Sequence, residues 1–413
     1  MILINLPAPH LRQPDAQVPL GLLYVAAAVE GCQIKDYATY SMDEAIADLP
    51  RDEFYGITCT SLQLPRANEF AGMIKAKYNY SNIILGGPGT VTPEYVDWGS
   101  VDSILQGEGE LVIGDAIKEK LSKRIYKGHT VDVNKCPLPA RHLVENQGGN
   151  IFSKNQNYFE GGSAQIITSR GCSFNCAFCA APQNGSKVRY RDIENVVTEI
   201  KQVIEQYGIR QFRIADDNFT TSKQRVIDFC KQVAPLGIAF RISARVKPFD
   251  VEMARALKAA GCKEISFGVE SFDDKVLKRL RKNTTARDNC IALAVCHSVG
   301  IKTRALLMIG TPYQTLDTII SNMIFTTDIH IDTIACTHFM PLPGSDVYNN
   351  PERYGIEIVS RDLAKYNFYS FDRTGQTEFQ DIFTINGRDA NEVRAENADF
   401  MEYLKSTGKL NEG

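Results

Sequence analysis

The sequence has no uninterrupted run of about 18 apolar residues, the length that a helix needs to cross a lipid bilayer. Its first ten residues, MILINLPAPH, contain neither the basic n-region nor the apolar stretch of a secretory signal peptide. Repeats of fixed period and low-complexity tracts are also absent. The missing apolar run and the missing signal peptide predict a cytoplasmic protein that has no membrane partner.

An excess of positive charge is missing as well, since 46 lysines and arginines stand against 49 aspartates and glutamates, for a formal net charge of -3. Such a chain has no overall basic field to hold a polyanion, so we do not expect nucleic acid as a partner. The stretch KRLRKN at 278–283 is locally basic. We interpret it as the solvated end of a helix.

A disulfide framework is the third absence, because the 11 cysteines are odd in number and lack the regular spacing of disulfide-rich domains. The cysteines therefore favour a reducing compartment.

The chain of 413 residues exceeds the size at which one hydrophobic core stops growing, which predicts two domains. We expect the protein to be a monomer.

Residues 1–130 predict an α/β domain with a doubly wound, Rossmann-like sheet. Four short apolar runs, MILINLP, EFYGITCTS, NIILGGP and VDSILQGE, read as buried parallel strands and alternate with helix-length segments. Ligands of such sheets bind at the carboxyl ends of the strands. Residues 131–162 are rich in proline, asparagine and glycine and are expected to be a linker.

Residues 163–350 predict a second α/β domain of about six strand and helix units, and residues 351–413 a short C-terminal extension. Six units are too few for a closed eight-fold barrel, so we expect an open, partial (β/α)6 barrel. The expected helices lie near 192–207, 222–234, 250–260 and 274–280. Functional groups are again expected at the carboxyl ends of the strands.

Cys172, Cys176 and Cys179 lie within eight residues, directly after the first strand of this barrel. A structural zinc site needs four ligands, and the next cysteine, Cys230, falls inside an expected helix. A redox pair needs only two thiols and usually opens a helix in a thioredoxin-like unit. Three thiolates with an open fourth position suit an iron-sulfur cluster, whose remaining iron can bind a substrate or cofactor.

The spacing C-x3-C-x-aromatic-C, with Phe178 as the aromatic residue and SRG in front, resembles the signature of the radical S-adenosylmethionine (SAM) enzymes. Further stretches between 163 and 350 resemble the family's SAM-binding elements: RIADDNF, ISARV, SFGVES, LMIGTPYQT and FMPLPGSDVY. In LMIGTPYQT, Tyr313 and Gln314 replace the family's usual glycine and glutamate. The resemblance implies a 4Fe-4S cluster on the three cysteines and the following SAM contacts: Phe178, Asp216, Asp217, Asn218, Ser243, Arg245, Glu270, Ile309, Gly310 and Met340.

Arg245 and Glu270 are charged residues at the ends of expected strands, and two roles are open for them. The resemblance implies that Arg245 meets the carboxylate of SAM and that Glu270 meets its ribose or amine. A structural ion pair between the two side chains is the alternative.

The first domain resembles the cobalamin-binding domain that one large radical SAM subfamily carries. The matching stretches are PLGLLYVAAAVE, ITCTS with LPRANEFA, ILGGPGTVTPE and ILQGEGE. The implied cobalamin contacts are Leu20, Gly21, Thr60, Ser61, Leu62, Gln63, Leu64, Gly86, Gly87, Pro88, Gly107 and Glu108. The motif D-x-H-x-x-G is absent, and His10 lacks its context, so we expect no protein histidine on cobalt. A domain that only supports the barrel and binds nothing is the alternative.

The resemblance implies a cobalamin-dependent radical SAM methyltransferase acting at an unactivated carbon of a small-molecule or peptide substrate. A 5'-deoxyadenosyl radical would abstract a hydrogen, methylcobalamin would supply the methyl group, and a flavodoxin or ferredoxin type of reductant would deliver single electrons. Two alternatives stay open. One is a radical cyclisation or rearrangement without methylation, and the other is a non-catalytic cofactor-binding sensor.

The remaining cysteines receive no chemical role. Cys32, Cys59, Cys262, Cys290 and Cys296 fall on apolar faces, where cysteine behaves as a small hydrophobic residue. Cys136 and Cys336 are less settled, and either could approach the active site.

Overall fold

The computed structural model describes residues 1–7, 18–128, 130–145, 162–180, 187–366 and 382–410. It divides into two compact units, Met1–Gln165 and Ile166–Gly413. The described part of the expected linker belongs with the first unit, where the backbone N–H of Val131 donates to Glu108 Oε2 at 2.8 Å and that of Ala140 to the Leu23 carbonyl at 3.1 Å.

The first unit is built on a six-stranded sheet of order β2-β1-β3-β4-β5-β6 in which every adjacent pair is parallel. The strands are β1 (Ile2–Asn5), β2 (Gln33–Asp36), β3 (Phe54–Thr58), β4 (Asn82–Gly86), β5 (Ser103–Gln106) and β6 (Ile125–Lys127). This is the doubly wound fold expected from the sequence, and its strand order reverses at β1 and β3, where such sheets bind ligands. The edge strands β2 and β6 were not among the four predicted strands.

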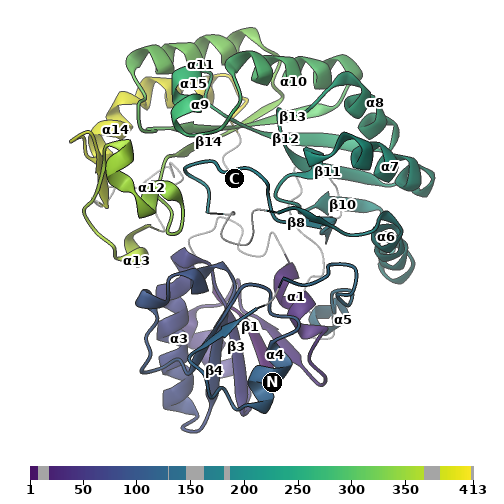
Figure 1. Cartoon of the computed structure of the whole chain (residues 1–413), viewed down its shortest axis with the longest axis vertical. Coiled ribbons are helices and arrows are strands. Elements are labelled where there is room, and N and C mark those ends of the chain that lie inside the picture. The colour runs from purple at the N-terminus through teal and green to yellow at the C-terminus, as the bar shows by residue number, and fades with distance from the viewer. Residues whose placement is uncertain (8–17, 129, 146–161, 181–186, 367–381, 411–413) are drawn as a thin grey trace. The chain divides into compact units, whose positions relative to one another are not determined.

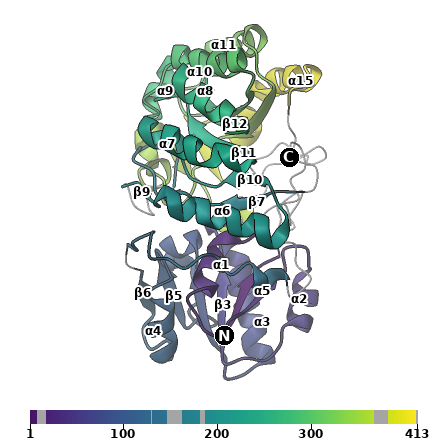
Figure 2. The same ribbon diagram turned by 90° about the vertical axis from the view of Figure 1, so that its right-hand side faces the viewer.

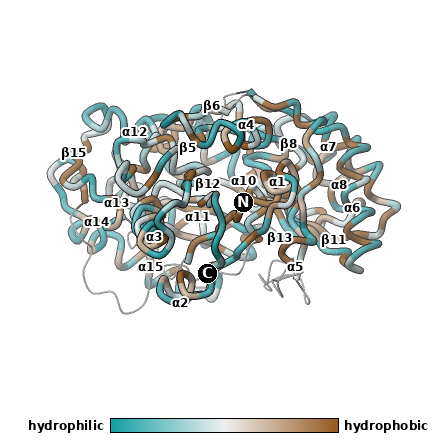
Figure 3. The backbone as a smooth tube through the Cα atoms, turned by 90° about the horizontal axis from the view of Figure 1, so that it is seen from below, coloured by the Kyte–Doolittle hydropathy of each residue, from teal (hydrophilic) through white to brown (hydrophobic). Residues whose placement is uncertain are grey.

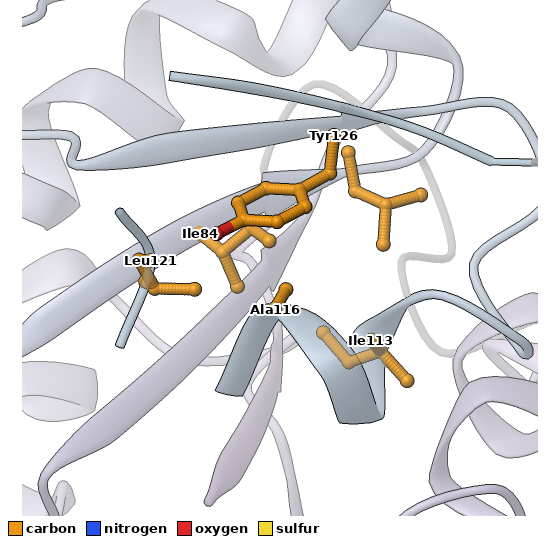
Figure 4. Packing of buried hydrophobic residues seen from close by; sticks show 6 residues of the cluster. Ile84, Ile113, Ala116, Leu121 and Tyr126 are labelled. Atoms are coloured by element: carbon orange, nitrogen blue, oxygen red, sulfur yellow. The ribbon is translucent and has the colours of Figure 1, made fainter. Parts of the chain in front are cut away.

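Helices cover this sheet (Figure 1). They are α1 (Leu20–Ala26), α2 (Met42–Asp48), α3 (Leu64–Lys77), α4 (Ile113–Lys118) and α5 (His142–Glu145). Ser41 caps α2 by accepting from the Glu44 N–H, while the Glu44 side chain accepts from the Ser41 N–H. Figure 4 shows the core between α4 and the strands, formed by Ile84, Leu105, Ile113, Ala116, Leu121 and Tyr126. These side chains are at most 6% exposed.

The second unit contains a six-stranded sheet of order β14-β13-β12-β11-β10-β7. Its strands are β7 (Ala164–Ile166), β10 (Gln211–Ile214), β11 (Ala239–Arg245), β12 (Cys262–Glu270), β13 (Lys302–Ile309) and β14 (Thr333–His338). The pairs from β10 to β14 are all parallel. The sheet ends at β7 and β14 without closing, which confirms the expected partial barrel.

One layer of helices lies on the outer side of this sheet, and Figure 2 shows α6 and α7 along β10 and β11. The helices are α6 (Ile193–Tyr207), α7 (Lys223–Val233), α8 (Val251–Ala259), α9 (Asp274–Arg279), α10 (Ala286–Val299) and α11 (Leu316–Asp328). Hydrophobic and hydrophilic segments alternate along α6 and α8 in Figure 3, as expected of helices that bury one face. The Phe240 ring of β11 contacts the Phe229 ring of α7, with centroids 5.8 Å apart.

The remaining elements follow β14. They are α12 (Asp346–Asn349), β15 (Ile356–Ile358), α13 (Leu363–Tyr366), β16 (Phe383–Ile385), α14 (Ala390–Glu396) and α15 (Ala398–Ser406). Strands β15 and β16 pair in antiparallel fashion. Among the described residues, the helices are all too short or too polar to span a membrane.

Candidate active site

The three cysteines occupy a loop that is held at both ends by a small two-stranded ribbon. Strand β8 (Ser169–Arg170) precedes the loop and pairs in antiparallel fashion with β9 (Arg189–Tyr190). Ala177 anchors the loop centre, because its N–H donates to the Leu280 carbonyl at 2.9 Å and its carbonyl accepts from the Val347 N–H at 3.0 Å. The thiols are therefore presented from a loop whose backbone is fixed by α9 and α12.

The donor set of this loop, three cysteine thiols, is of the kind that holds an iron-sulfur cluster. Cys176 is buried, whereas Cys172 and Cys179 are half-buried. In the described residues, no group of three or more histidine, cysteine, aspartate or glutamate side chains could hold one metal ion. A cubane cluster instead takes one thiolate per iron, so its ligands stand at separate corners. Burial raises the pKa of the Cys172 thiol, and the positive charge of Arg245 acts in the opposite direction.

Arg245, the last residue of β11, reaches the cysteine loop. Its Nη1 donates to Cys176 Sγ at 3.1 Å, and its Nη2 donates to the Lys282 carbonyl. The guanidinium carbon lies 3.8 Å from the centre of the Phe174 ring. Arg245 Nε is buried and has no hydrogen-bond partner in the described structure. This side chain thus holds a positive charge against a cysteine sulfur and keeps one donor for a ligand.

Glu270, which is half-buried, ends β12 and forms an ion pair with the buried Lys282, in which Lys282 Nζ lies 2.8 Å from Glu270 Oε1. The register of β12 against β13 shifts between Gly268 and Glu270, and Glu270 has a φ of 63°. A Cβ at Gly268 would come within 2.7 Å of both Glu270 Oε1 and Lys282 Nζ, so glycine makes room for the pair. Backbone strain of this kind is typical of functional sites.

The expected alternative for Arg245 and Glu270, an ion pair between the two, is not what the structure shows, because each has another partner. The interpretation of KRLRKN as a solvated helix end was wrong for Lys282, which is 4% exposed and joins both residues. Sequence reasoning missed it because a basic run is usually solvated. The sequence carries no clear signal of this contact, because Glu270 lies 12 residues before Lys282 and the two share no motif.

The stretch after β10 contributes two side chains, Asp216 and Asn218, which have different roles. Asp216 is buried and accepts hydrogen bonds from the Thr168 N–H, Thr168 Oγ1 and Ser169 Oγ at 2.5 to 2.6 Å. Burial raises its pKa, which these bonds oppose. Asp216 therefore braces the strand that leads into the cysteine loop. Asn218 accepts from the Arg245 N–H at 3.2 Å, while its Nδ2 is buried without a partner among the described groups and fits a ligand.

The carboxyl end of β13 is fixed by the C-terminal helices. The Gly310 N–H donates to Gln314 Oε1 at 2.8 Å, and Gln314 Nε2 donates to Asn397 Oδ1 at 2.9 Å. Tyr313 has a φ of 71°, the conformation that the family's glycine at this position would adopt readily. Gln314, which stands where the family usually has glutamate, thus links the end of β13 to Asn397.

The other expected SAM contacts lie on the same unit. Ile309 and Met340 are buried, Phe178 and Ser243 are half-buried, and Asp217 is exposed. Their roles toward SAM stay predictions.

In the first unit, the expected cobalamin contacts gather at the carboxyl edge of the sheet, around β3, β4 and β5. Two short 3-10 helices, Ser61–Gln63 and Pro88–Val91, follow β3 and β4. Gln63 folds back to accept from the Thr60 N–H at 3.0 Å. Of the remaining expected contacts, Leu20 and Leu64 are buried, Ser61, Leu62, Gly86, Gly87 and Glu108 are half-buried, and Gly21, Thr60, Pro88 and Gly107 are exposed.

Gly86 and Gly87, at the end of β4, differ in the space that a side chain would find. A Cβ at Gly86 would meet nothing within 4 Å, so Gly86 borders open space. A Cβ at Gly87 would lie 2.7 Å from the Cys59 carbonyl oxygen, and Gly87 has a φ of 87°. Gly87 is therefore required by the protein's own backbone, while a side chain at Gly86 would enter open space. His10 lies outside the described residues.

Comparisons with known proteins agree with this geometry. Residues 166–323 match the sequence profile of the Radical SAM superfamily. An uncharacterized methyltransferase of Pyrococcus horikoshii is 27% identical over 355 residues, covering 80% of this chain and 77% of that protein. An anaerobic magnesium-protoporphyrin IX monomethyl ester cyclase of Rubrivivax gelatinosus is 28% identical over 204 residues, covering 48% of this chain but only 36% of the cyclase.

Among solved structures, the radical SAM methyltransferase TsrM of Kitasatospora setae, with cobalamin and a [4Fe-4S] cluster bound, superposes with a TM-score of 0.72. The match covers 100% of this chain and 92% of TsrM at 16% sequence identity, and so concerns the fold. The cysteine spacing, the partial barrel and the matched profile lead to one conclusion, that residues 166–323 of this chain form a radical SAM domain.

Proposed function

We propose that the chain is a cobalamin-dependent radical SAM enzyme that methylates an unactivated carbon atom. The observation that carries the proposal is the three-cysteine loop beside β11, where Arg245 binds one cysteine sulfur and keeps a buried donor for a ligand. Relatives that are named methyltransferases, including that of Pyrococcus horikoshii, support methylation as the outcome.

When bound, the cluster and SAM supply radical chemistry, and cobalamin supplies a transferable methyl group. The chain's own residues position these groups. Cys172, Cys176 and Cys179 would each hold one iron, while Arg245 screens the charge of the Cys176 thiolate. Glu270, oriented by Lys282, presents its second carboxylate oxygen to a hydroxyl or amine of SAM.

Cobalamin would lie on the carboxyl edge of the first sheet, where Gly86 leaves space free. No protein histidine is assigned to its lower face. We further propose that the protein works as a cytoplasmic monomer and receives electrons from a flavodoxin or ferredoxin type of protein. The free state of all 11 cysteines suits a reducing compartment.

The test begins with protein reconstituted anaerobically with iron, sulfide and cobalamin, to which a chemical reductant and SAM with a 13C-labelled methyl group are added. The proposal predicts that cobalamin stays with the protein through gel filtration and acquires the label. Protein that takes up iron but never cobalamin would show that the first unit only supports the barrel.

A second outcome is favoured by one observation, the similarity to the magnesium-protoporphyrin ester cyclase. Here the radical chemistry would cyclise the substrate without methylating it. The product mass separates the two functions, because methylation adds one CH2 and consumes two molecules of SAM per turnover.

A further inference from the structure

Three arginines lie inside the partial barrel. They are on strands that also lead to the candidate active site, but they come earlier along those strands than the active-site residues do. Arg213 is on β10, Arg241 on β11 and Arg304 on β13. In the register of the sheet, Arg213 pairs with Arg241, and Arg304 pairs with Ser266 of β12.

The direction of these side chains follows from their neighbours. Phe240 faces the outer helices, since its ring contacts that of Phe229 on α7. Successive residues of a strand point to opposite faces, so Arg241 and its register partner Arg213 point to the helix-free face. Phe267 contacts Phe249, which lies two residues before the start of α8, so Phe267 faces the helices and its neighbour Ser266 shares the inner face with Arg304.

The three guanidinium groups are close enough to repel one another. Burial, followed by repulsion from Arg241 and Arg304, lowers the pKa of Arg213 from 12.5 to about 10. Arg304 Nε is buried without a hydrogen-bond partner in the described structure. Glu264, which is fully buried and pairs in register with Arg241, contributes one negative charge at this level. At this level of the sheet, the three arginines and Glu264 together carry a net positive charge.

Arg241 is buried and Arg213 and Arg304 are half-buried, and a partly buried cluster of like charges is stabilised when an anion binds it. Guanidinium groups bind carboxylates and phosphates through paired, charge-assisted hydrogen bonds. We propose, building on the function proposed above, that Arg213, Arg241 and Arg304 bind an anionic carboxylate or phosphate group of the substrate inside the barrel.

The depth of the cluster sets the length of that substrate. Arg241 lies four residues before Arg245 on β11, which corresponds to roughly 13 Å along the strand. Arg245 contacts Cys176, so the distance approximates that from the anion to the cysteine end of the site. The enzyme would thus select an elongated substrate whose anionic end lies well away from the carbon that reacts.

The test uses the full-length, iron- and cobalamin-loaded protein titrated with inorganic phosphate and, separately, with glutarate as a carboxylate probe. Thermal unfolding of the wild type and Arg304→Met is followed at each concentration. Arg255→Met is the matched control, because Arg255 is exposed on the outer helix α8.

We expect at least one probe to raise the melting temperature of the wild type and of Arg255→Met in a saturable way. Arg304→Met should weaken that binding at least tenfold, while its own melting temperature without probe stays equal to or above that of the wild type, because a repelling charge is gone. A wild type that binds neither probe saturably overturns the proposal. So does an Arg304→Met protein that melts lower yet responds to the probes unchanged.

Cleavage of SAM by Arg304→Met separates this inference from the function on which it rests. A variant that loses anion binding but still cleaves SAM on reduction supports both. If wild-type protein binds the probes yet never cleaves SAM, the function fails while the anion site stands.

Discussion

Arg245 is the residue that connects the barrel scaffold to the expected cluster. Its Nη1 lies 3.1 Å from Cys176 Sγ, and a cationic donor on a thiolate stabilises the more negative, reduced state of an iron-sulfur cluster. Arg245→Met should therefore lower the midpoint potential of the reconstituted cluster while iron content is kept. A redox titration monitored by electron paramagnetic resonance measures this, with the exposed Arg287→Met as the control. Equal potentials in the two variants would remove Arg245 from this role.

The pair formed by Glu270 and Lys282 predicts an effect on SAM binding. Replacing either residue alone would leave the charge of its partner without an ion pair. The informative variant is therefore the double change Glu270→Gln with Lys282→Met. Loss of a charge-assisted hydrogen bond costs about 1.5 to 3 kcal/mol, which corresponds to about a tenfold to hundredfold rise in the SAM dissociation constant. Equilibrium binding of SAM under anaerobic conditions gives the value.

Lys275→Met is the control for this pair, because Lys275 is exposed on α9. If the double variant unfolds at lower temperature but binds SAM as the wild type does, the pair has a structural role only.

The cysteines give the simplest prediction at this scale. Replacing Cys172, Cys176 and Cys179 together by alanine should abolish cluster absorbance, bound iron-sulfur stoichiometry and SAM cleavage, since each thiolate would hold a different iron. Cys290→Ala, a half-buried cysteine of α10, should change none of these. A triple variant that retains iron and activity is incompatible with radical SAM chemistry here.

At the scale of elements, the loops after β3 and β4 determine which glycine tests cobalamin binding. Gly86→Leu adds a side chain into open space, so it should prevent cobalamin uptake while leaving iron content and melting temperature near those of the wild type. Gly87→Leu should instead destabilise the fold, because its Cβ would meet the Cys59 backbone and its φ of 87° disfavours a side chain.

The two glycine variants are compared by visible absorbance of bound cobalamin, by iron content and by thermal unfolding. Normal cobalamin uptake by Gly86→Leu would place the corrin elsewhere.

The strongly patterned elements were predictable from the sequence. Strands such as β11 and β12 and helices such as α6 to α8 lie where apolar runs and helical periodicity indicated. The edge strands β2 and β6 were not predicted, because their sequences, QIKD and IYK, are short and partly exposed. Within the site, the motif predicted the cysteines. Lys282 could not be predicted, because its burial depends on contact with Glu270 and on the space left by Gly268, which the basic run itself does not reveal.

At the scale of the molecule, the chain combines two sheets whose carboxyl edges carry different expected cofactors. The first unit has the doubly wound sheet with Gly86 at an open edge, and the second has the partial barrel with the cysteine loop. Each set of contacts belongs to one unit, so loss of one cofactor should leave the other bound. This independence is what makes Gly86→Leu and the triple cysteine variant complementary.

The most direct measurement reduces protein loaded with both iron-sulfur cluster and cobalamin, adds SAM, and quantifies S-adenosylhomocysteine and 5'-deoxyadenosine by chromatography. The account predicts both products from the wild type, the first from methyl transfer to cobalamin and the second from reductive cleavage of SAM. It predicts that the triple cysteine variant forms no 5'-deoxyadenosine. A fully loaded wild-type protein that forms neither product would contradict the assignment of this chain as a cobalamin-dependent radical SAM methyltransferase.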